Sequence, residues 1–445
     1  MILTEAHVIR KKRSTGELFH RIDNYCYLAK NLHNAVNYRI KQCIRICRKL
    51  KEDQPLEKWE QEFLGELNEA IVLYNAGRAE KKQLHLLGRE NGNIADAYFL
   101  SWYLKGSPEY CEMPYATCSQ ICIQNVCRNW KSFYRGMKEW KKNPEKFHGM
   151  PRTPGYLDKT AGREPLVLTK QNISEDEHGT IRLPRFLEGI YLKTGKKNIH
   201  QIRIVTEKDR ILIDLLYEQQ EEPPTCADGV MGIDLGINNL MTVCTDTGLP
   251  PFIINGRPLK SINQYYNKQK ALLQSGSMLQ NGKHVTQRIR RLTGKRNRKV
   301  KDYMHKASHT VIRTALENGI GTIVIGKNRG WKQEVSMGNR TNQNFVGIPY
   351  YRLIEMIRYK AVLAGIRVVV TEESYTSGTS YLDEEQPIKK NYDKSRRIHR
   401  GLFRSSKGIL INADVNAAYQ IMKKAGLGSG GTPKSGECVR RIKVA

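Results

Sequence analysis

The chain has 445 residues, with 74 Lys or Arg against 44 Asp or Glu, so its formal net charge is +30 and its pI is about 9.7. This length allows two or three domains, and the excess of positive charge favours a nucleic-acid partner. No apolar run is long enough to cross a bilayer, and the charge is spread along the chain, so a membrane protein is not expected. The first residues lack the apolar core of a signal peptide, so we expect a cytoplasmic protein whose ten cysteines are free thiols.

Residues 1–15 are expected to form a short strand followed by a basic run. From about 21 to 147 the pattern is helical, because apolar residues between 28 and 47 recur at three- and four-residue steps. A second helix, roughly 115–141, mixes aromatic and cationic side chains, which suits a groove where bases stack and phosphates pair. An ordinary helix, with its aromatics in a core and its lysines in solvent, explains the pattern equally well. The candidate nucleic-acid contacts here are Arg128, Trp130, Lys131 and Tyr134.

Two pairs of cysteines, Cys43 with Cys47 and Cys118 with Cys122, stand one helical turn apart in this helical part. No Cys-x-x-Cys pair occurs anywhere in the chain. We therefore expect these thiols to be small core residues rather than metal ligands.

Prolines and glycines between 144 and 155 end the helical part. Short strands are expected within 164–218, most clearly at 202–205 and 211–216. The segment 219–225, Gln-Gln-Glu-Glu-Pro-Pro-Thr, is the best candidate for a linker between domains.

Beyond this linker the pattern changes to alternating strands and helices. A long basic helix is expected between Arg288 and Lys306, where nine Lys or Arg stand against one acid, Asp302. The tail is rich in Gly, Ser and Lys and is expected to be disordered. The expected strands are 230–236, 240–246, 251–255, 322–325 and 366–371, and the other expected helices are 349–364 and 412–424. The candidate nucleic-acid contacts of the basic helix are Arg288, Arg290, Arg291, Lys295, Arg296, Arg298 and Lys299.

Two acidic motifs carry the candidate chemistry. Asp234 stands in an apolar strand between Gly232 and Gly236, which allow close approach of backbone or substrate. Asp414 opens a helix that Asn412 is placed to cap. An ionised carboxylate in an apolar setting is costly unless it is compensated, and a hard cation such as Mg²⁺ is the usual partner where several carboxylates converge. The pair therefore predicts metal-dependent chemistry on a phosphate backbone, which needs three or four carboxylates on neighbouring elements.

These motifs resemble those of the TnpB-like proteins of insertion-sequence transposons, which are RNA-guided DNA endonucleases related to type V CRISPR effectors. The segments 232–236 and 411–419 resemble the first and third motifs of the RuvC nuclease domain, and 29–35, 129–134 and 146–151 resemble other parts of the family. The resemblance implies an α+β and α/β multidomain chain, in which a helical recognition lobe with wedge-like β-strands precedes an RNase H-like (RuvC) α/β nuclease domain. The implied domains are 1–20 with 150–225 (wedge-like β domain), 21–149 (recognition lobe), 226–425 (nuclease domain, with an insertion at about 378–410) and 426–445 (disordered tail).

The resemblance also implies the activity and the partners. It implies an endonuclease that uses two Mg²⁺ ions, with Mn²⁺ as a substitute, and that binds a guide RNA and double-stranded target DNA. Base pairing with the guide would read sequence, while the protein would read a short flanking motif and backbone shape. The resemblance implies a prokaryotic cytoplasmic protein, associated with the nucleoid when bound to DNA and without a membrane partner. It leaves the oligomeric state open.

One departure from the family concerns the second RuvC motif, where an apolar strand ordinarily ends in Glu. Here the strand 323–325 is followed by Gly326. Glu372 and Glu373 end the next strand, which lies beside the first in the RNase H-like fold, so one of them can fill the gap. Side-chain alternation lets only one face the metals; we favour Glu373, and Glu334 is a weaker candidate. The expected catalytic and metal-binding residues are Asp234, Glu373 and Asp414, with Glu372 as the alternative to Glu373.

A second departure concerns the zinc ribbon of many family members. Residues 378–410 contain no cysteine, and His399 alone cannot build a tetrahedral site, so no zinc is expected. The segment is basic and includes Arg396 and Arg397, which are candidate nucleic-acid contacts. A metal-free insertion facing nucleic acid and a disordered surface loop are nearly equal interpretations.

Two other functions stay open. Gly326 allows a nuclease-dead, RNA-guided DNA-binding repressor, although Asp234 and Asp414 are both retained. A guide-independent, structure-specific resolvase would explain the RuvC-like core alone. The large basic helical part before that core argues against the resolvase.

Overall fold

A computed structural model describes residues 1–175, 179–207, 209–328, 339–399, 401–428, 439–442 and 444. The chain divides into two compact units, Met1–Gln219 and Gln220–Ala445. The division falls at the start of the segment 219–225, which carries no helix or strand. Among the described residues, no helix is long and apolar enough to cross a membrane.

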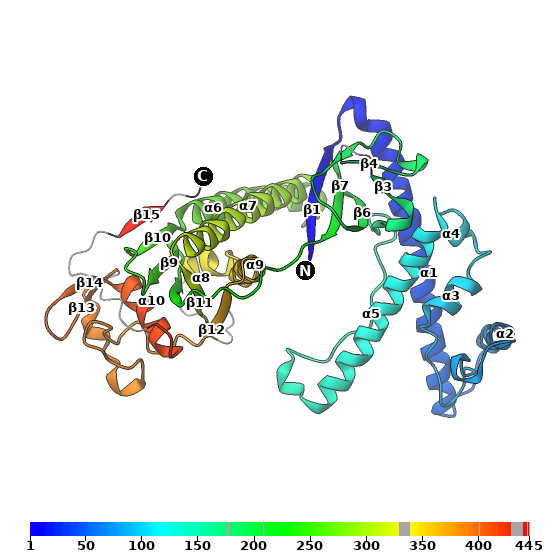
Figure 1. The fold of residues 1–445 in the computed structure, drawn as a ribbon. Coiled ribbons are helices and arrows are strands. Elements are labelled where there is room, and N and C mark those ends of the chain that lie inside the picture. The colour runs from blue at the N-terminus through cyan, green and yellow to red at the C-terminus, as the bar shows by residue number, and fades with distance from the viewer. Residues whose placement is uncertain are drawn as a thin grey trace. The chain divides into compact units, whose positions relative to one another are not determined.

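The first unit contains an antiparallel sheet of four strands in the order β1-β7-β6-β2 (Figure 1). β1 pairs along its whole length with β7, from Ile2 opposite Glu218 to Arg10 opposite Arg210. The beginning of the chain is therefore part of the same sheet as the strands just before the division. The strands are β1 (Ile2–Arg10), β2 (Leu166–Thr169), β6 (Ile199–Glu207) and β7 (Arg210–Glu218), and a smaller sheet holds β3 (Ser174–Glu175), β4 (Thr180–Arg182) and β5 (Leu192–Lys193).

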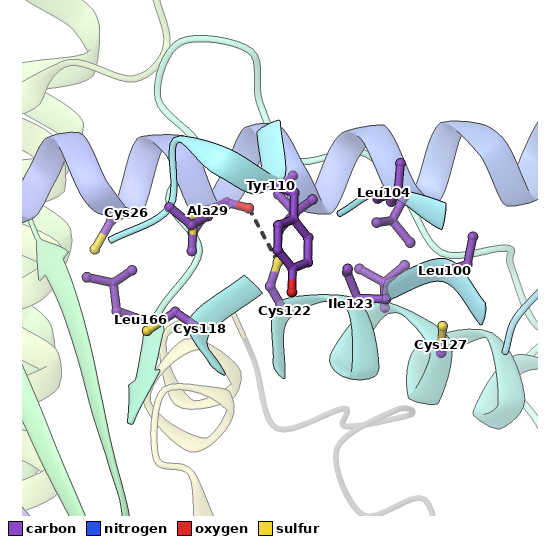
Figure 2. Close-up of a cluster of buried hydrophobic side chains, with 14 of the residues drawn as sticks. Cys26, Ala29, Leu100, Leu104, Tyr110, Cys118, Cys122, Ile123, Cys127 and Leu166 are labelled. Atoms are coloured by element: carbon purple, nitrogen blue, oxygen red, sulfur yellow. Dashed lines mark hydrogen bonds between the residues drawn. The ribbon is translucent and has the colours of Figure 1, made fainter. Parts of the chain in front are cut away.

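The helices of the first unit pack mainly through α1 and α5. Figure 2 shows buried cysteines between these helices, with a dashed line from the Cys122 thiol to the Ala29 carbonyl. The thiols of Cys26, Cys118 and Cys122 donate to backbone carbonyls at 3.4–3.7 Å, and burial raises the pKa of all three. Cys43, Cys47, Cys118 and Cys122 are all buried, so the expected role of both pairs as core residues is confirmed. The helices are α1 (Gly16–Lys51), α2 (Lys58–Asn75), α3 (Ala97–Tyr103), α4 (Pro108–Cys111) and α5 (Ala116–Lys142), and 3-10 turns lie at Arg13–Thr15, Glu80–Lys82, Pro144–Lys146, Lys170–Asn172 and Arg185–Leu187.

The second unit is built on a mixed sheet of six strands in the order β12-β11-β8-β9-β10-β15. β8, β9 and β10 pair antiparallel, while β11 runs parallel to β8 and β12 parallel to β11. The carboxyl ends of β8, β11 and β12 consequently lie at the same edge of the sheet. The strands are β8 (Gly229–Leu235), β9 (Asn239–Thr245), β10 (Phe252–Asn255), β11 (Ile320–Gly326), β12 (Arg367–Thr371) and β15 (Arg440–Ile442).

Helices cover both faces of this sheet (Figure 1). Alternate residues of β8 reach two cores, so Met231 and Ile233 pack with α7 and α9 while Val230 packs with α10. Gly232 lets α10 approach closely, because a Cβ there would lie 2.5 Å from the Ala418 carbonyl oxygen. The helices are α6 (Arg257–Asn281), α7 (Gln287–Glu317), α8 (Asn339–Val346), α9 (Tyr350–Leu363) and α10 (Ala413–Lys424), with 3-10 turns at Lys389–Asn391 and Lys394–Arg396 and a hairpin of β13 (Leu402–Arg404) and β14 (Leu410–Asn412).

The expectation of a disordered tail over 426–445 is wrong at Arg440–Ile442. These residues form β15, which pairs parallel with β10, with Phe252 opposite Arg440 and Ile254 opposite Ile442. The unpaired backbone groups of an edge strand can bind another strand whatever its side chains are. Composition and periodicity could not reveal this pairing, because three residues are too few to show a pattern.

Candidate active site

One pocket of about 680 Å³ lies at the carboxyl end of β8 and collects the predicted carboxylates. Asp234 enters it from β8, Glu373 from the residues just after β12, and Asp414 from the first turn of α10. These positions are far apart in the chain and are brought together by the parallel pairing of β8, β11 and β12 and by the packing of α10 on β8. Three oxygen-donor side chains therefore converge at one edge of the sheet.

Glu373 takes the space that a side chain at position 326 would occupy. Gly326 ends β11 opposite Thr371 of β12. A Cβ on Gly326 would lie 3.2 Å from Glu373 Oε2 and 2.5 Å from Ile421 Cδ1. Glu372 is exposed, accepts from the Ser374 hydroxyl and lies 3.4 Å from Lys424 Nζ, outside this pocket. Glu334 lies outside the described residues.

Asn328, two residues beyond Gly326, fixes the position of Glu373. The Glu373 N–H donates to Asn328 Oδ1 at 3.0 Å, and Asn328 Nδ2 donates to Glu373 Oε1 at 3.3 Å. One side chain thus holds both the backbone and the carboxylate of Glu373. The end of β11 supplies no carboxylate of its own, but it supplies the amide that orients the neighbouring one.

Asp414 is held at both its backbone and its carboxylate. Asn412 Oδ1 accepts from the N–H groups of Asp414 and Val415 at 3.0 and 3.3 Å, which confirms the predicted helix cap. Asp414 Oδ2 accepts from Asn239 Nδ2 at 2.7 Å, and its Oδ1 accepts from Arg397 Nη2 at 3.3 Å. Arg397, predicted as a nucleic-acid contact, therefore lies inside the pocket beside a carboxylate.

The positive charge near the pocket does not offset the burial and mutual repulsion of its carboxylates. Burial raises the pKa of Asp234 well above its ordinary value, repulsion from Asp414 and Glu373 adds to this, and Arg397 opposes it. Burial also raises the pKa of Glu373 to about 7, against the attraction of Lys424. Raised carboxyl pKa values in a pocket are typical of groups that bind a cation or a proton.

The donor set fits a divalent cation. Carboxylate oxygens are the ligands that Mg²⁺ and Mn²⁺ prefer, and a cation would relieve the repulsion that raises the pKa of Asp234. In this conformation, no group of three or more His, Cys, Asp or Glu side chains in the described ranges is arranged to hold an ion. Arg397 contacts an oxygen of Asp414 that a cation would also use.

The predicted basic helix is part of α7, and most of its cations face solvent. Arg296 is the exception, because it is half-buried and its guanidinium is bonded within the protein; its contact with nucleic acid stays a prediction. Its Nε donates to Asn263 Oδ1 at 2.7 Å and its Nη2 donates to the Gly347 carbonyl, which fastens α7 to α6 and to the segment before α9. A half-buried arginine and its exposed neighbours look alike in sequence. The exposed cations are Arg288, Arg290, Arg291, Lys295, Arg298 and Lys299.

The aromatic residues of α5 belong to the core of the first unit. Trp130 is buried and its Nε1 donates to Asn37 Oδ1 at 2.9 Å, so its prediction as a stacking surface for bases is wrong. Tyr134 is half-buried, with its ring centroid 5.9 Å from that of Trp130. Arg128 and Lys131 are exposed. For these aromatics, the interpretation as an ordinary amphipathic helix is the one that holds.

Arg396 is half-buried and forms ion pairs within the protein, and its contact with nucleic acid stays a prediction. Its guanidinium lies 2.6 Å from Glu385, 3.7 Å from Asp393 and 4.0 Å from Asp383. All four residues belong to the cysteine-free segment 378–410. A cluster of ion pairs therefore stabilises this segment.

The same segment is also tied to α10. Asn416 Nδ2 donates to the Thr379 carbonyl at 2.8 Å, and Asn416 Oδ1 accepts from the Tyr381 N–H at 2.9 Å. The ring of Tyr381 stacks on that of Tyr419, with centroids 4.7 Å apart. The described residues of the segment are folded against the helix that carries Asp414, and the interpretation as a disordered loop is wrong for them.

Several polar residues of the pocket were not predicted from the sequence, among them Asn239, Arg257, Asn328 and Arg441. Asn239 and Asn328 stand in segments already singled out, close after Asp234 and Gly326, and their amide side chains were the available signal. Arg441 lies in the tail and gave no signal, because its place in the pocket depends on the pairing of β15 with β10.

Comparisons with known proteins match two adjoining segments of the chain. Residues 214–332 match the OrfB_IS605 family, described as a probable transposase, and residues 350–421 match a Cas12f1-like TNB domain. The chain is 26% identical over 260 residues to the CRISPR-associated endodeoxyribonuclease Cas12f1 of Sulfoacidibacillus thermotolerans, covering 55% of this chain and 56% of the relative. It is 29% identical over 242 residues to the TnpB-like protein ORF457 of Acidianus two-tailed virus, covering 52% and 47%. The matches thus span about half the length of these relatives.

The fold is similar to that of a solved complex. The cryo-EM structure of a Cas12f1–sgRNA–target DNA complex matches with a TM-score of 0.50 and 14% identity, over 94% of this chain and 98% of that protein. At this identity the likeness shows a shared mixed helix-and-sheet fold. The resemblance to TnpB-like proteins is confirmed: one segment of the chain matches the OrfB_IS605 family, and a later segment matches a Cas12f1-like TNB domain.

Proposed function

We propose that this chain is an RNA-guided DNA endonuclease that hydrolyses phosphodiester bonds in the pocket formed by Asp234, Glu373 and Asp414. The observation that carries the proposal is the convergence of these three side chains, with Glu373 Oε2 only 3.2 Å from the Cβ position of Gly326. The adjacent, parallel β11 and β12 support an RNase H-like nuclease domain. The names of the relatives, an endodeoxyribonuclease and a TnpB-like protein, support the same class.

In this proposal Asp234, Glu373 and Asp414 hold two divalent cations, Mg²⁺ or Mn²⁺. Such ions supply a nucleophilic water and stabilise charge on the leaving oxygen. Asn328 and Asn239 orient two of the three carboxylates through hydrogen bonds. Arg397 compensates the negative charge of the pocket before a cation binds and offers its guanidinium to a phosphate afterwards.

The partners in this proposal are a guide RNA and double-stranded target DNA. The exposed cations of α7, together with Arg128 and Lys131 of α5, supply positive charge along two helices. Counterion release gives such surfaces affinity for nucleic acid without sequence preference, so base pairing with the guide would supply the specificity. We assign 21–149 to a recognition lobe, 1–20 with 150–225 to a β domain beside it, and 226–425 to the nuclease domain.

The proposal is tested with the chain expressed together with its native flanking DNA. The bound RNA is sequenced, and the purified complex is incubated with matching and mismatched plasmids in Mg²⁺. We expect Asp234→Ala to reduce cleavage of the matching plasmid by about 10³-fold or more, because the pocket loses a central carboxylate, while RNA binding is unchanged. Loss of RNA binding in Asp234→Ala would contradict a catalytic role.

Adjacent glutamates provide a matched pair of variants for the third carboxylate. Glu373→Ala should abolish cleavage as Asp234→Ala does, whereas Glu372→Ala, which removes an exposed acid outside the pocket, should change the rate less than about threefold. The opposite ranking of the two variants would overturn the assignment of Glu373.

A nuclease-dead repressor is the second candidate, because Gly326 supplies no carboxylate and no acidic cluster in the described ranges is arranged to hold an ion. It predicts tight, guide-dependent DNA binding without cleavage in Mg²⁺ or Mn²⁺. Cleavage that depends on Glu373 would exclude it.

A further inference from the structure

The strand β15 brings an arginine from the end of the chain into the pocket. Arg441 lines the pocket together with Arg257, the first residue of α6. It lies beyond both segments that match known families, which end at residues 332 and 421. Its position follows from the pairing of Arg441 with Ile253 of β10.

A short chain of hydrogen bonds connects Arg441 to a predicted metal ligand. Arg441 Nη2 donates to Asn239 Oδ1 at 3.3 Å, and Asn239 Nδ2 donates to Asp414 Oδ2 at 2.7 Å. A cation at the amide oxygen polarises the amide and makes its N–H group a stronger donor. Arg441 therefore favours the side-chain orientation in which Asn239 holds Asp414.

The same guanidinium is placed to bind a phosphate. Arg441 is exposed, and a guanidinium carries five N–H donors, so the contact with Asn239 leaves donors directed to solvent. The planar arrangement of these donors matches phosphate oxygens in a bidentate manner. Arg257, also exposed, adds a second positive charge to the same pocket.

We propose that Arg441 binds a backbone phosphate of the nucleic-acid strand at the pocket and positions Asp414 through Asn239. This inference rests on the proposed endonuclease function. The helix that carries Asp414 ends at Lys424. In this inference β15, which follows that helix in the chain, is also a functional part of the site.

The neighbouring Arg440 provides a matched control. Side chains alternate along a strand, and Arg440 accordingly lines a different groove, with His309 and Arg313 of α7. Arg440→Ala and Arg441→Ala remove the same charge from the same strand. Only the second removes the contact with Asn239.

The first measurement is the cleavage rate of the purified complex with a matching plasmid in Mg²⁺. We expect a loss of about 10- to 100-fold for Arg441→Ala and less than about threefold for Arg440→Ala, with the same amount of bound RNA in both. Arg441→Lys should recover part of the loss, because it restores the charge but not the bidentate contact. Equal losses in Arg440→Ala and Arg441→Ala, or no recovery in Arg441→Lys, would overturn the inference.

A double-variant cycle tests the link through Asn239. If Arg441 acts partly through Asn239, then Asn239→Ala with Arg441→Ala should lose less activity than the product of the two separate losses. A loss equal to that product would overturn the positioning role.

A binding measurement separates this inference from the proposed function. If the wild-type complex cuts nothing, the endonuclease proposal fails, and the affinity for a short labelled single-stranded DNA is then measured against salt concentration. Removal of one phosphate contact should make the slope of log K against log[salt] shallower by about 0.7 in Arg441→Ala and leave it unchanged in Arg440→Ala. The same slope in wild type and Arg441→Ala would overturn the phosphate contact.

Discussion

At the scale of single residues, a carboxylate at position 373 can replace one at position 326 for a simple geometric reason. The two strands that end near these positions are adjacent and parallel, so side chains leaving their ends reach the same volume. A side chain at position 326 would crowd this volume, since the Cβ position of Gly326 is 3.2 Å from Glu373 Oε2 and 2.5 Å from Ile421 Cδ1. We therefore expect the side chains at positions 326 and 373 to depend on each other.

This dependence predicts the behaviour of exchanged carboxylates. Gly326→Glu alone should abolish plasmid cleavage, because two side chains then compete for one volume. Adding Glu373→Ala should restore cleavage to at least about tenfold above that of the Glu373→Ala single variant, since one carboxylate again faces Asp234 and Asp414. Rates of plasmid cleavage by purified complexes measure both effects.

The variant Ile421→Val controls for a clash between a side chain at position 326 and Ile421. A Cβ at position 326 would also lie 2.5 Å from Ile421 Cδ1, and Ile421→Val removes that atom. A double variant that is no better than Glu373→Ala alone, with or without Ile421→Val, would refute the exchange.

At the scale of elements, the packing of α10 on β8 places Asp414 opposite Asp234 and depends on Gly232. A Cβ at this position would meet the Ala418 carbonyl oxygen and Met422 Cγ, each at 2.5 Å. Gly232→Ala should therefore lower the free energy of unfolding by about 1–3 kcal/mol, because a packed helix would have to move away from the sheet. Chemical denaturation gives this quantity.

Gly276 of α6 serves as the control, because a Cβ there would have nothing within 4 Å. Gly276→Ala should raise the free energy of unfolding by about 0.5–1 kcal/mol, since alanine loses less conformational freedom in a helix. Destabilisation of similar size in both variants would show that close packing is not the cause.

The contact between α1 and α2 gives a prediction of pH dependence. Glu60 is buried and accepts hydrogen bonds from Lys49 Nζ at 2.7 Å, from the Glu57 N–H at 3.0 Å and from Arg45 Nη2 at 2.7 Å. The bond from Lys49, followed by the other two, lowers the pKa of Glu60 from 4.5 to about 2 against the opposing effect of burial. A lowered folded-state pKa stabilises the fold above the unfolded pKa, and this contribution is lost as the pH falls towards 2.

Glu60→Gln should therefore lower the melting temperature by a constant amount between about pH 7 and 5, and the difference should shrink below about pH 4.5. Melting curves of wild type and Glu60→Gln across this range measure it. A difference that does not change with pH down to 3 would mean that the ionised form of Glu60 is not what stabilises the contact.

At the scale of the whole molecule, most elements were predictable because their apolar patterns are long. The strands around Asp234 and the helix that begins after Asn412 follow from the periodicity of their apolar residues, and the resemblance to known motifs identified their acids. The entry of Glu373 rather than Glu372 into the pocket depends on the register of β12 against β11.

Other features could not be predicted because they depend on partners distant in sequence. Trp130 was misread since its hydrogen-bond partner, Asn37, lies on another helix. The ion pairs of Arg396 could not be predicted, since its acidic partners come from an irregular segment without periodicity. β15 was missed because it exists only through the backbone of β10. In each case the missing information was tertiary contact.

The pocket residues are far apart in the chain, so the pocket can form only late in synthesis. Asp414 follows Asp234 by 180 residues, and at about 5–20 residues per second a ribosome needs roughly 10–40 s to add them. The first unit has its own sheet and core and ends at Gln219, shortly before Asp234, where this interval begins. A nascent chain can therefore complete the fold of its first unit before it contains Asp414, and the proposed site cannot form until α10 has been added.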